Sequence, residues 1–191
     1  MLEYRDGDAH AFDMLYERHK GPLFRYCLRH CGERGAAEET FQDVWMRVIG
    51  ARARYRPSAK FTTWLYRIAR NRVIDHYRAG NPGRAESLDD ASSAFEPRAA
   101  ETSEPGRRVD SERAAARLAA LLAELPAEQR DAFLLHEEAG LGLDDIARLA
   151  GVGRETAKSR LRYALKKLRE ALRNELGDEW GTSEGRVRDE T

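Results

Sequence analysis

The 191-residue sequence has no long hydrophobic run, only two cysteines and no net charge. No stretch of about eighteen apolar residues occurs, so we expect no membrane-spanning helix. The opening residues, MLEYRDGDAH, lack the apolar segment of a signal peptide, which favours a protein that stays in the cytoplasm. Two cysteines cannot build a disulfide framework. With a charged fraction of 35%, the chain is typical of a helical, water-soluble protein.

The two cysteines, Cys27 and Cys31, flank His30 and would share one face of a helix. A metal site needs three or four ligands, and the only other histidines nearby are His10 and His19. Two small buried side chains explain the cysteines more simply. We therefore predict no metal site and no cofactor, and a redox or metal role for the cysteines stays open.

The neutral total hides a strong segregation of charge. Residues 52–84 hold nine Lys/Arg against one acid, residues 85–112 hold eight acids against three bases, and residues 151–176 return to eight bases against three acids. Two basic segments separated by an acidic one suggest two contacts with a long polyanion. Solvated helix faces are the alternative explanation on charge alone.

Apolar periodicity predicts an all-α fold, beginning with a bundle of helices over residues 8–79. Residues 9–31 read as a helix with a break or kink at Gly21–Pro22, and residues 36–52 read as a second. Thr62 or Thr63 can cap a third helix ending near Arg78. The predicted inward stripes are Phe41, Val44, Trp45, Val48 and Ile49 on the second helix, and Leu65, Ile68, Ala69 and Val73 on the third.

Residues 80–112 are rich in Gly, Pro, Ser, Ala and acids without apolar periodicity, which predicts a flexible linker between two domains. The second domain is expected over 113–176, followed by a polar, disordered tail over 177–191. Two helices are predicted at 111–124 and 126–139, the latter with Pro126 in its first turn.

The stretch LDDIARLAGVGRETAKSRL has the pattern of a helix-turn-helix. Small Ala147 permits close packing, and Gly151 can take the positive φ of a tight turn. An ordinary helical hairpin is the alternative. The second helix would be anchored by Leu161, Ala164, Leu165, Leu168 and Leu172, leaving its polar residues outward.

Three segments in this order resemble the extracytoplasmic-function sigma factors of bacterial RNA polymerase, members of the sigma-70 family. AEETFQDVWMRV resembles the polymerase-binding segment, and FTTWLYRIARNRVIDHYR the segment that melts and reads the −10 element. LPAEQRDAFLLHEEAGLGLDDIARLAGVGRETAKSRL resembles the domain that reads the −35 element. Family members are not enzymes, and the resemblance implies two helical domains, region 2 over 8–79 and region 4 over 113–176.

The resemblance implies three sets of site residues. The polymerase-binding residues would be Glu39, Gln42 and Asp43. The −10 DNA-binding residues would be Tyr55, Arg56, Ser58, Lys60, Phe61, Arg67, Arg70, Asn71 and Arg78. The −35 DNA-binding residues would be Arg154, Glu155, Thr156, Lys158, Ser159 and Arg162.

The crowding of rings and cations at 55–78 suits single-stranded DNA, since unstacked bases stack on aromatics and phosphates need cations. A flipped base would sit in the loop 55–61 with Asn71 behind it, because an amide can both donate to and accept from a base edge. Trp64 reads more readily as domain support than as a base contact. Asp75 reads more readily as an acid that orients Arg72 and Arg78.

The implied partners are the RNA polymerase core (its β′ and β subunits), promoter DNA and an anti-sigma protein. The alternative is a stand-alone helix-turn-helix regulator with an N-terminal sensory domain, which leaves the single-strand chemistry of 55–78 unexplained. An enzyme is disfavoured because no carboxylate or histidine cluster and no Gly-rich phosphate loop occurs in the sequence.

Overall fold

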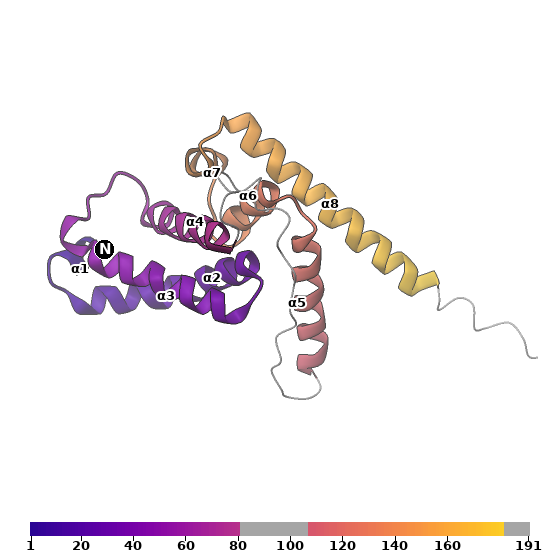
Figure 1. Ribbon diagram of the computed structural model, residues 1–191, viewed down its shortest axis with the longest axis horizontal. Helices are drawn as coiled ribbons and strands as arrows, with labels where there is room; N and C mark the ends of the chain where they lie inside the picture. The colour runs from indigo at the N-terminus through magenta and orange to yellow at the C-terminus, as the bar shows by residue number, and fades with distance from the viewer. Residues whose placement is uncertain (81–106, 182–191) are drawn as a thin grey trace, which may run out of the picture.

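The computed structural model describes residues 1–80 and 107–181, with side chains described for residues 1–79 and 114–174. Within these ranges the chain is helical and has no strand, which confirms the predicted all-α class (Figure 1). The elements are α1 (Leu2–Arg5), α2 (Ala9–Cys31), α3 (Arg34–Gly50), the short 3-10 helix η1 (Arg52–Arg54), α4 (Phe61–Gly80), α5 (Arg107–Ala123), α6 (Ala127–Glu137), α7 (Leu143–Ala150) and α8 (Arg154–Gly181).

The first domain packs α2, α3 and α4 around one apolar core. The predicted stripes lie inside for the most part: Val44, Val48, Leu65 and Ala69 are fully buried. Ile49 is the exception, because its side chain is 40% exposed at the end of α3. The core therefore follows the expected helical periodicity and ends one residue short of the predicted stripe.

Of the predicted break or kink at Gly21–Pro22, the break is wrong, because α2 continues through Pro22 to Cys31. Proline removes one backbone donor and crowds the preceding turn, which costs about 3 kcal/mol in a free helix. Here α2 has buried side chains on both sides of the proline, from Ala11 to Leu23 and Tyr26. Packing against α3 and α4 offsets the local cost.

The predicted cap of α4 is also wrong, because the helix begins at Phe61 and places both threonines inside its first turn. The backbone N–H of Trp64 already donates to the carbonyl of Lys60 at 3.1 Å. Thr63 is completely buried. Phe61 packs against Trp64 at the start of the helix, so ring packing sets this end.

The second domain packs α5 to α8 around Leu122, Leu134, Leu135 and Ile146, all fully or almost fully buried. Its unusual core residue is Arg130, which is 1% exposed. The Arg130 guanidinium donates to the carbonyls of Leu122, Ala123 and Leu125 at 2.8, 3.0 and 3.2 Å. These carbonyls end α5, so a buried cation caps that helix. Pro126 directly precedes α6, so this helix begins one residue later than predicted.

The helix-turn-helix is confirmed as α7, a turn at Gly151 and α8. Gly151 has φ 70° and ends α7, and Ala147 is buried as expected. Two details differ from the prediction. Leu172 is 43% exposed and anchors nothing, and α8 continues to Gly181, into the predicted tail. Helix α5 likewise begins at Arg107, inside the predicted linker, whose other residues lie outside the described ranges, as do 182–191.

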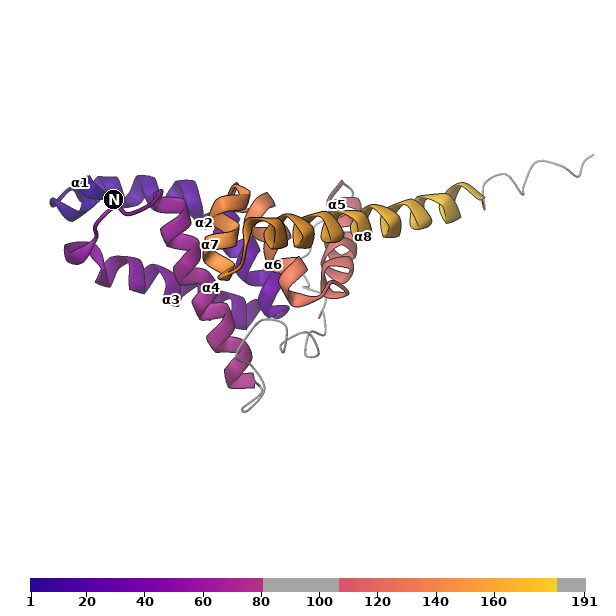
Figure 2. The same ribbon diagram turned by 90° about the horizontal axis from the view of Figure 1, so that it is seen from above.

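The two domains contact each other directly. Helices α5 and α6 contact α2, and α7 contacts α4; both views show α6 and α7 lying beside α2 and α4 (Figures 1 and 2). The C-terminal part of α8 extends away from the other helices. The sequence analysis treated the domains as independent units, so this contact is a structural finding.

Candidate nucleic-acid and polymerase interface

The loop before α4 is built on three aromatic rings. Tyr55 packs edge-on against Trp64 with ring centroids 4.9 Å apart, and Phe61 lies 5.8 Å from the same ring. Tyr55 is only 6% exposed, and burial raises the pKa of its hydroxyl. As placed, Tyr55 and Trp64 support the loop. A hollow of about 530 Å³ opens beside them, lined by Met1, Leu2, Glu3, Tyr55, Pro57, Ala59 and Phe61.

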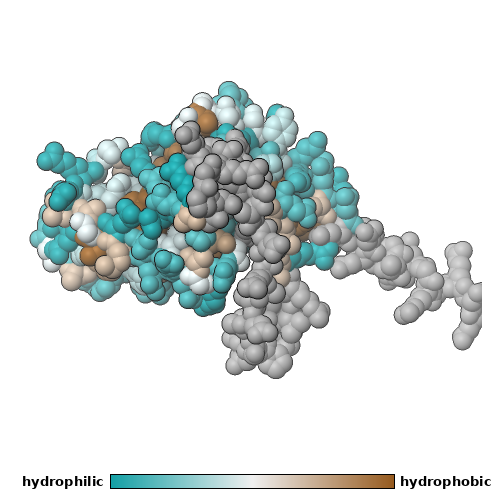
Figure 3. All heavy atoms as spheres, viewed as in Figure 1, coloured by the Kyte–Doolittle hydropathy of each residue, from teal (hydrophilic) through white to brown (hydrophobic). Residues whose placement is uncertain are grey.

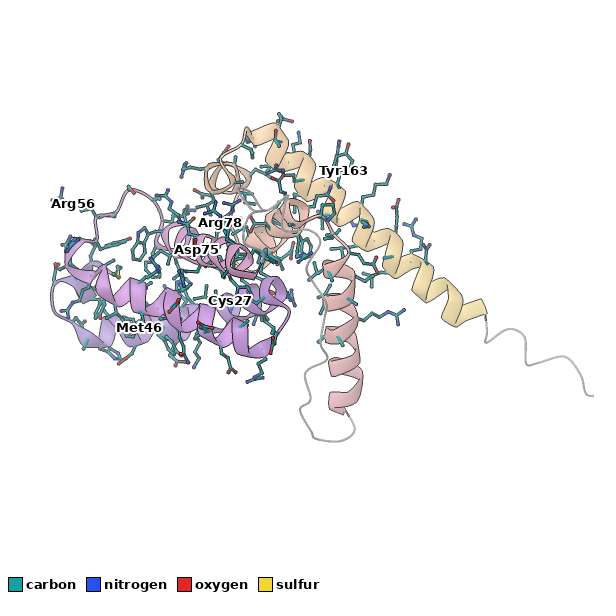
Figure 4. The ribbon with its side chains drawn as sticks, in the orientation of Figure 1. Cys27, Met46, Arg56, Asp75, Arg78 and Tyr163 are labelled. Carbon is teal, nitrogen blue, oxygen red and sulfur yellow. The ribbon has the colours of Figure 1, made fainter. Side chains whose placement is uncertain are left out.

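Polar and basic side chains surround this loop on its solvent side. Arg56, Ser58, Lys60 and Arg67 are all exposed, and Arg56 projects away from the helices (Figure 4). Three exposed cations beside half-buried Phe61 are the combination that a single strand needs: charge for phosphates and a ring face for a base.

Asn71 is exposed on α4 and lines a groove of about 740 Å³ between α3 and α4. The same groove is lined by Trp64, Ile68 and Met46. An amide in an open groove, backed by a ring, can donate and accept hydrogen bonds to a base edge. Trp64 lines this groove and also packs against Tyr55 and Phe61 at the two ends of the loop.

An ion-pair cluster that joins α3 to α4 lines the same groove. Arg72 pairs with Asp43 of α3 through one nitrogen, and its other terminal nitrogen lies 3.0 Å from Asp75 Oδ2. Asp75 thus orients Arg72, as expected. Asp43 differs from expectation, because it is half-buried and paired. Arg78, the last of the −10 set, is exposed near the end of α4, close to Asp75 in the chain (Figure 4).

Arg70 is the −10 candidate that lies away from this surface. Its guanidinium donates from Nε to Asp131 Oδ2 of α6 at 2.8 Å, and its side chain is only 14% exposed. Arg70 faces the second domain in this arrangement. A contact with DNA through Arg70 stays a prediction that requires the domains to separate.

The outer face of α3 carries the polymerase-binding candidates. Glu39 and Gln42 are exposed. One turn beyond Gln42 lies Met46, 65% exposed and pointing outward from α3 (Figure 4). An exposed methionine beside polar residues is typical of an adaptable protein-binding face. The sequence analysis missed Met46 because it lies outside the inward stripe. This side of the molecule is otherwise mainly hydrophilic, with small hydrophobic patches (Figure 3).

The start of α8 presents the −35 candidates to solvent. Arg154, Glu155, Thr156, Lys158 and Arg162 are exposed, and Ser159 is half-buried. The Ser159 hydroxyl donates to the carbonyl of Glu155 at 2.8 Å, so it is partly occupied.

Charged neighbours hold several of these side chains. Arg154 Nε lies 2.9 Å from Asp144 of α7, and Lys158 Nζ lies 3.5 Å from Glu155. The Arg162 guanidinium stacks over the exposed ring of Tyr163 at 5.1 Å. The acids hold Arg154 and Lys158 in place and lower the net positive charge of this helix start.

Lys167 lies further along α8 than the −35 candidates, where the sequence alone predicts contact only with phosphate or solvent. Its ammonium donates to the carbonyl of Glu124 at 2.7 Å, just beyond the end of α5. Lys167 therefore ties α8 to α5.

The cysteines lie on α2 in the first core. Cys27 is fully buried, and the Cys31 sulfur lies 3.5 Å from the Thr40 hydroxyl; burial raises the pKa of both thiols. Across residues 1–79 and 114–174, no three His, Cys, Asp or Glu side chains gather as metal ligands. None of the described helices is apolar enough over its length to cross a bilayer.

The sequence analysis missed a polar cluster between the domains. Asp131 of α6 is 2% exposed and accepts from the Tyr26 hydroxyl at 2.8 Å as well as from Arg70. A signal was present: Asp131 shares a helical face with the buried pair Leu134 and Leu135, at spacings of three and four.

Comparison with known proteins agrees with this geometry. Residues 15–81 match the family Sigma-70 region 2, and residues 115–168 match the family Sigma-70, region 4. The chain is 33% identical over 176 residues to the ECF RNA polymerase sigma factor SigL of Mycobacterium tuberculosis, covering 89% of this chain and 93% of SigL. It is 28% identical over 172 residues to the RNA polymerase sigma factor CarQ of Myxococcus xanthus, covering 90% and 95%.

Two solved structures share the fold. CnrH in complex with the cytosolic domain of CnrY gives a TM-score of 0.65 at 22% identity, covering 90% of this chain and 94% of CnrH. RpoE of Bartonella quintana in complex with the anti-sigma factor NepR gives 0.68 at 22% identity, covering 85% and 97%. With both family regions present in order and relatives matched over most of their length, the chain belongs to the extracytoplasmic-function RNA polymerase sigma factors of the sigma-70 family.

Proposed function

We propose that this chain directs the bacterial RNA polymerase core to specific promoters and helps to open them. The observation that carries the proposal is the pairing, within one chain, of two different DNA-binding surfaces. One is the ring-and-cation surface of the loop 55–61 and α4, suited to single strands. The other is the start of α8 in a helix-turn-helix, suited to the major groove of duplex DNA.

The residues divide into three roles under this proposal. Glu39, Gln42 and Met46 on α3 bind the polymerase core, through its β′ and β subunits. Arg56, Ser58, Lys60, Phe61, Arg67, Asn71 and Arg78 bind the opened −10 strand. Arg154, Glu155, Thr156, Lys158, Ser159 and Arg162 bind the −35 duplex.

The chain itself supplies no catalysis in this scheme, because polymerase performs the chemistry. As a polymerase subunit it works in the cytoplasm, where bacterial transcription takes place. One structural relative, RpoE, was solved in complex with the anti-sigma factor NepR, which supports an anti-sigma protein as a further partner of this chain.

The second candidate function, a stand-alone regulator, separates cleanly by experiment. Electrophoretic mobility of a promoter duplex is measured with the chain alone, with core polymerase alone and with both. We expect a specific complex only with both, since the residues 113–176 carry only twelve bases against ten acids. Equal and specific binding by the chain alone would overturn the proposal in favour of the regulator.

A further inference from the structure

The polar contact between the domains forms two linked clusters. In the first, the Asp131 carboxylate accepts from the Tyr26 hydroxyl and from Arg70 Nε, each at 2.8 Å. In the second, the Glu138 carboxylate lies 2.8 Å from Arg25 Nε and 2.7 Å from Arg29 Nη1. Both acids belong to the second domain, and all four partners belong to the first.

Both acids are buried where the domains meet, whereas Arg25 of the second cluster keeps 51% of its side chain exposed. The side chain of Asp131 is 3% exposed and that of Glu138 is 6% exposed. A carboxylate removed from water to this degree is unfavourable unless cations and donors satisfy it. Across the described residues, the cations that pair with the two acids lie on α2 and α4, so each acid depends on the opposite domain.

Further hydrogen bonds follow the same seam. The Tyr66 hydroxyl donates to the carbonyl of Glu138 at 3.4 Å. Tyr26 also packs edge-on against Tyr66 with centroids 5.2 Å apart. The contact is therefore a shaped, hydrogen-bonded interface, whereas two tethered domains that touch by chance would leave their charges in water.

The closed arrangement does not suit a promoter. The −10 and −35 elements are centred about 25 base pairs apart, which is roughly 85 Å of duplex. Helices α4 and α7 lie in contact, so two DNA surfaces this close cannot reach both elements. The 27 peptide steps from Gly80 to Arg107 can extend to about 90 Å, so the chain length permits the domains to separate.

From these contacts we propose that Asp131 and Glu138 form an intramolecular latch that holds the two domains together and keeps Arg70 from DNA until polymerase or promoter separates them. This inference rests on the proposed function for its consequence at the promoter, but the latch itself is a property of the chain alone. Asp131 stands in for a DNA phosphate: both are anions that accept hydrogen bonds from a guanidinium.

Small-angle X-ray scattering of the full chain tests the latch without polymerase or promoter. Asp131→Asn removes the charge with almost no change in shape, and we expect a larger radius of gyration than for the unaltered chain. Glu137→Gln is the matched control, because it removes the same charge from the same helix at a side chain that is 50% exposed. We expect its scattering profile to equal that of the unaltered chain.

Binding to fluorescein-labelled oligo(dT), followed by anisotropy, tests the second half of the proposal. If only the open chain binds, the apparent affinity is the intrinsic affinity multiplied by the fraction of open chains. For a chain that is open about one tenth of the time, full opening by Asp131→Asn should therefore tighten oligo(dT) binding about tenfold. Arg70→Gln combined with Asp131→Asn should lose most of that gain. Circular dichroism checks that each variant is folded. If Asp131→Asn does not fold, Glu138→Gln replaces it as the variant that opens the latch.

The outcomes separate the claims. Unchanged scattering for folded Asp131→Asn and folded Glu138→Gln would overturn the latch. A larger radius of gyration with unchanged oligo(dT) affinity would overturn the claim that Asp131 competes with DNA for Arg70. Since neither measurement involves polymerase, failure of the sigma-factor assignment would show instead as a missing polymerase-dependent complex.

Discussion

At the scale of single residues, Asn71 gives the sharpest prediction. Asn71→Ala should weaken promoter opening by roughly 1–3 kcal/mol, the usual value of a base contact, because its amide acts on a base exposed only after melting. The side chain is exposed, so folding should be unaffected. Permanganate reactivity on a normal and on a pre-opened template measures promoter opening. Arg67→Ala, which removes a phosphate contact, should instead weaken both the closed and the open complex. Equal defects of Asn71→Ala in closed-complex binding and in opening would show that its role is structural.

A second residue-level prediction concerns the start of α8. Arg154→Ala or Lys158→Ala should alter the preferred −35 bases and remove about 1–3 kcal/mol of discrimination. Arg169→Ala, an exposed cation four turns further along the helix, should weaken binding without changing the base profile. A transcription scan of all −35 substitutions compares the three. An unchanged profile for both Arg154→Ala and Lys158→Ala contradicts the assignment of α8 as the recognition helix.

The predicted polymerase-binding face of α3 gives a third residue-level prediction. Glu39→Arg should reduce binding to core polymerase in a pull-down with a loss of folding stability within about 0.5 kcal/mol, because the side chain is exposed. Asp13→Arg is the control, because it makes an equal charge change at an exposed side chain of α2. Asp43→Arg is a poorer probe than Glu39→Arg, since it would place a second cation beside Arg72 of α4. Undiminished binding of Glu39→Arg would remove α3 from the interface.

The placement of side chains was predicted well where helical periodicity decides it, and poorly where a distant partner decides it. The sequence was sufficient to place Asn71, Arg154 and Lys158 on solvent-facing surfaces, because helical periodicity determines that. It was insufficient for Arg70 and Lys167, whose partners lie 61 and 43 residues away. No periodic pattern reports which side chain meets another across that separation.

At the scale of elements, the same distinction holds. Strong apolar periods predicted α3, α4, α7 and most of α8, and the Gly151 turn followed from backbone sterics alone. The predicted break in α2 failed because proline is a local signal, whereas the helix is held by side chains on both sides of it. Composition also predicted a linker that overlaps the first residues of α5 and a tail that overlaps the last residues of α8. Frequent Arg, Glu and Ala suit either a coil or an exposed helix, so composition could not place these boundaries.

Buried His30 on α2 makes the element-level prediction. Its ring packs edge-on against Tyr26 with centroids 4.5 Å apart, and both ring nitrogens are buried. Burial lowers the pKa of His30 below its ordinary 6.5. Arg130 and Arg70 lower it further, although Asp131 of α6, 3.5 Å from Nε2, opposes the shift. The folded chain therefore favours the neutral ring.

The sign follows from proton linkage. The unfolded chain binds a proton near pH 6.5 and the folded chain only at lower pH, so stability is full above about pH 6.5 and is lost as pH falls through the folded pKa. The loss is at most about 1.4 kcal/mol per pH unit. Urea unfolding at about pH 7.5 and about pH 5.5 measures it, and His30→Gln should show the smaller difference. Equal pH dependence in both proteins contradicts the prediction.

Asp131 adds to the same trend at lower pH. Burial by itself would raise the pKa of this carboxyl, but His30 and Arg70 together hold it below its usual value. Its contribution is present above about pH 4 and is lost as pH falls further. Both groups therefore favour a closed, folded chain near neutral pH.

At the scale of the whole molecule, acids balance the bases, and we expect neither domain to bind DNA strongly alone. The full chain has 33 basic and 33 acidic residues, and acids such as Asp144 and Glu155 lie beside the cations of α8. Specificity then arises when polymerase holds both domains over one promoter, which raises the effective concentration of each surface at its element. The contact between the domains could not be read from the sequence, because it depends on how two separate cores dock.

The most direct test of this account is run-off transcription from a template pool with randomised −35 and −10 windows. Purified core polymerase is supplied with the chain, and transcribed templates are sequenced. We predict transcripts only when both are present, and two enriched motifs with a fixed spacing, one for each DNA-binding surface. The absence of polymerase-dependent transcripts, or transcripts with one enriched duplex motif and no −10 motif, would contradict the claim that this chain recognises and opens promoters as a polymerase subunit.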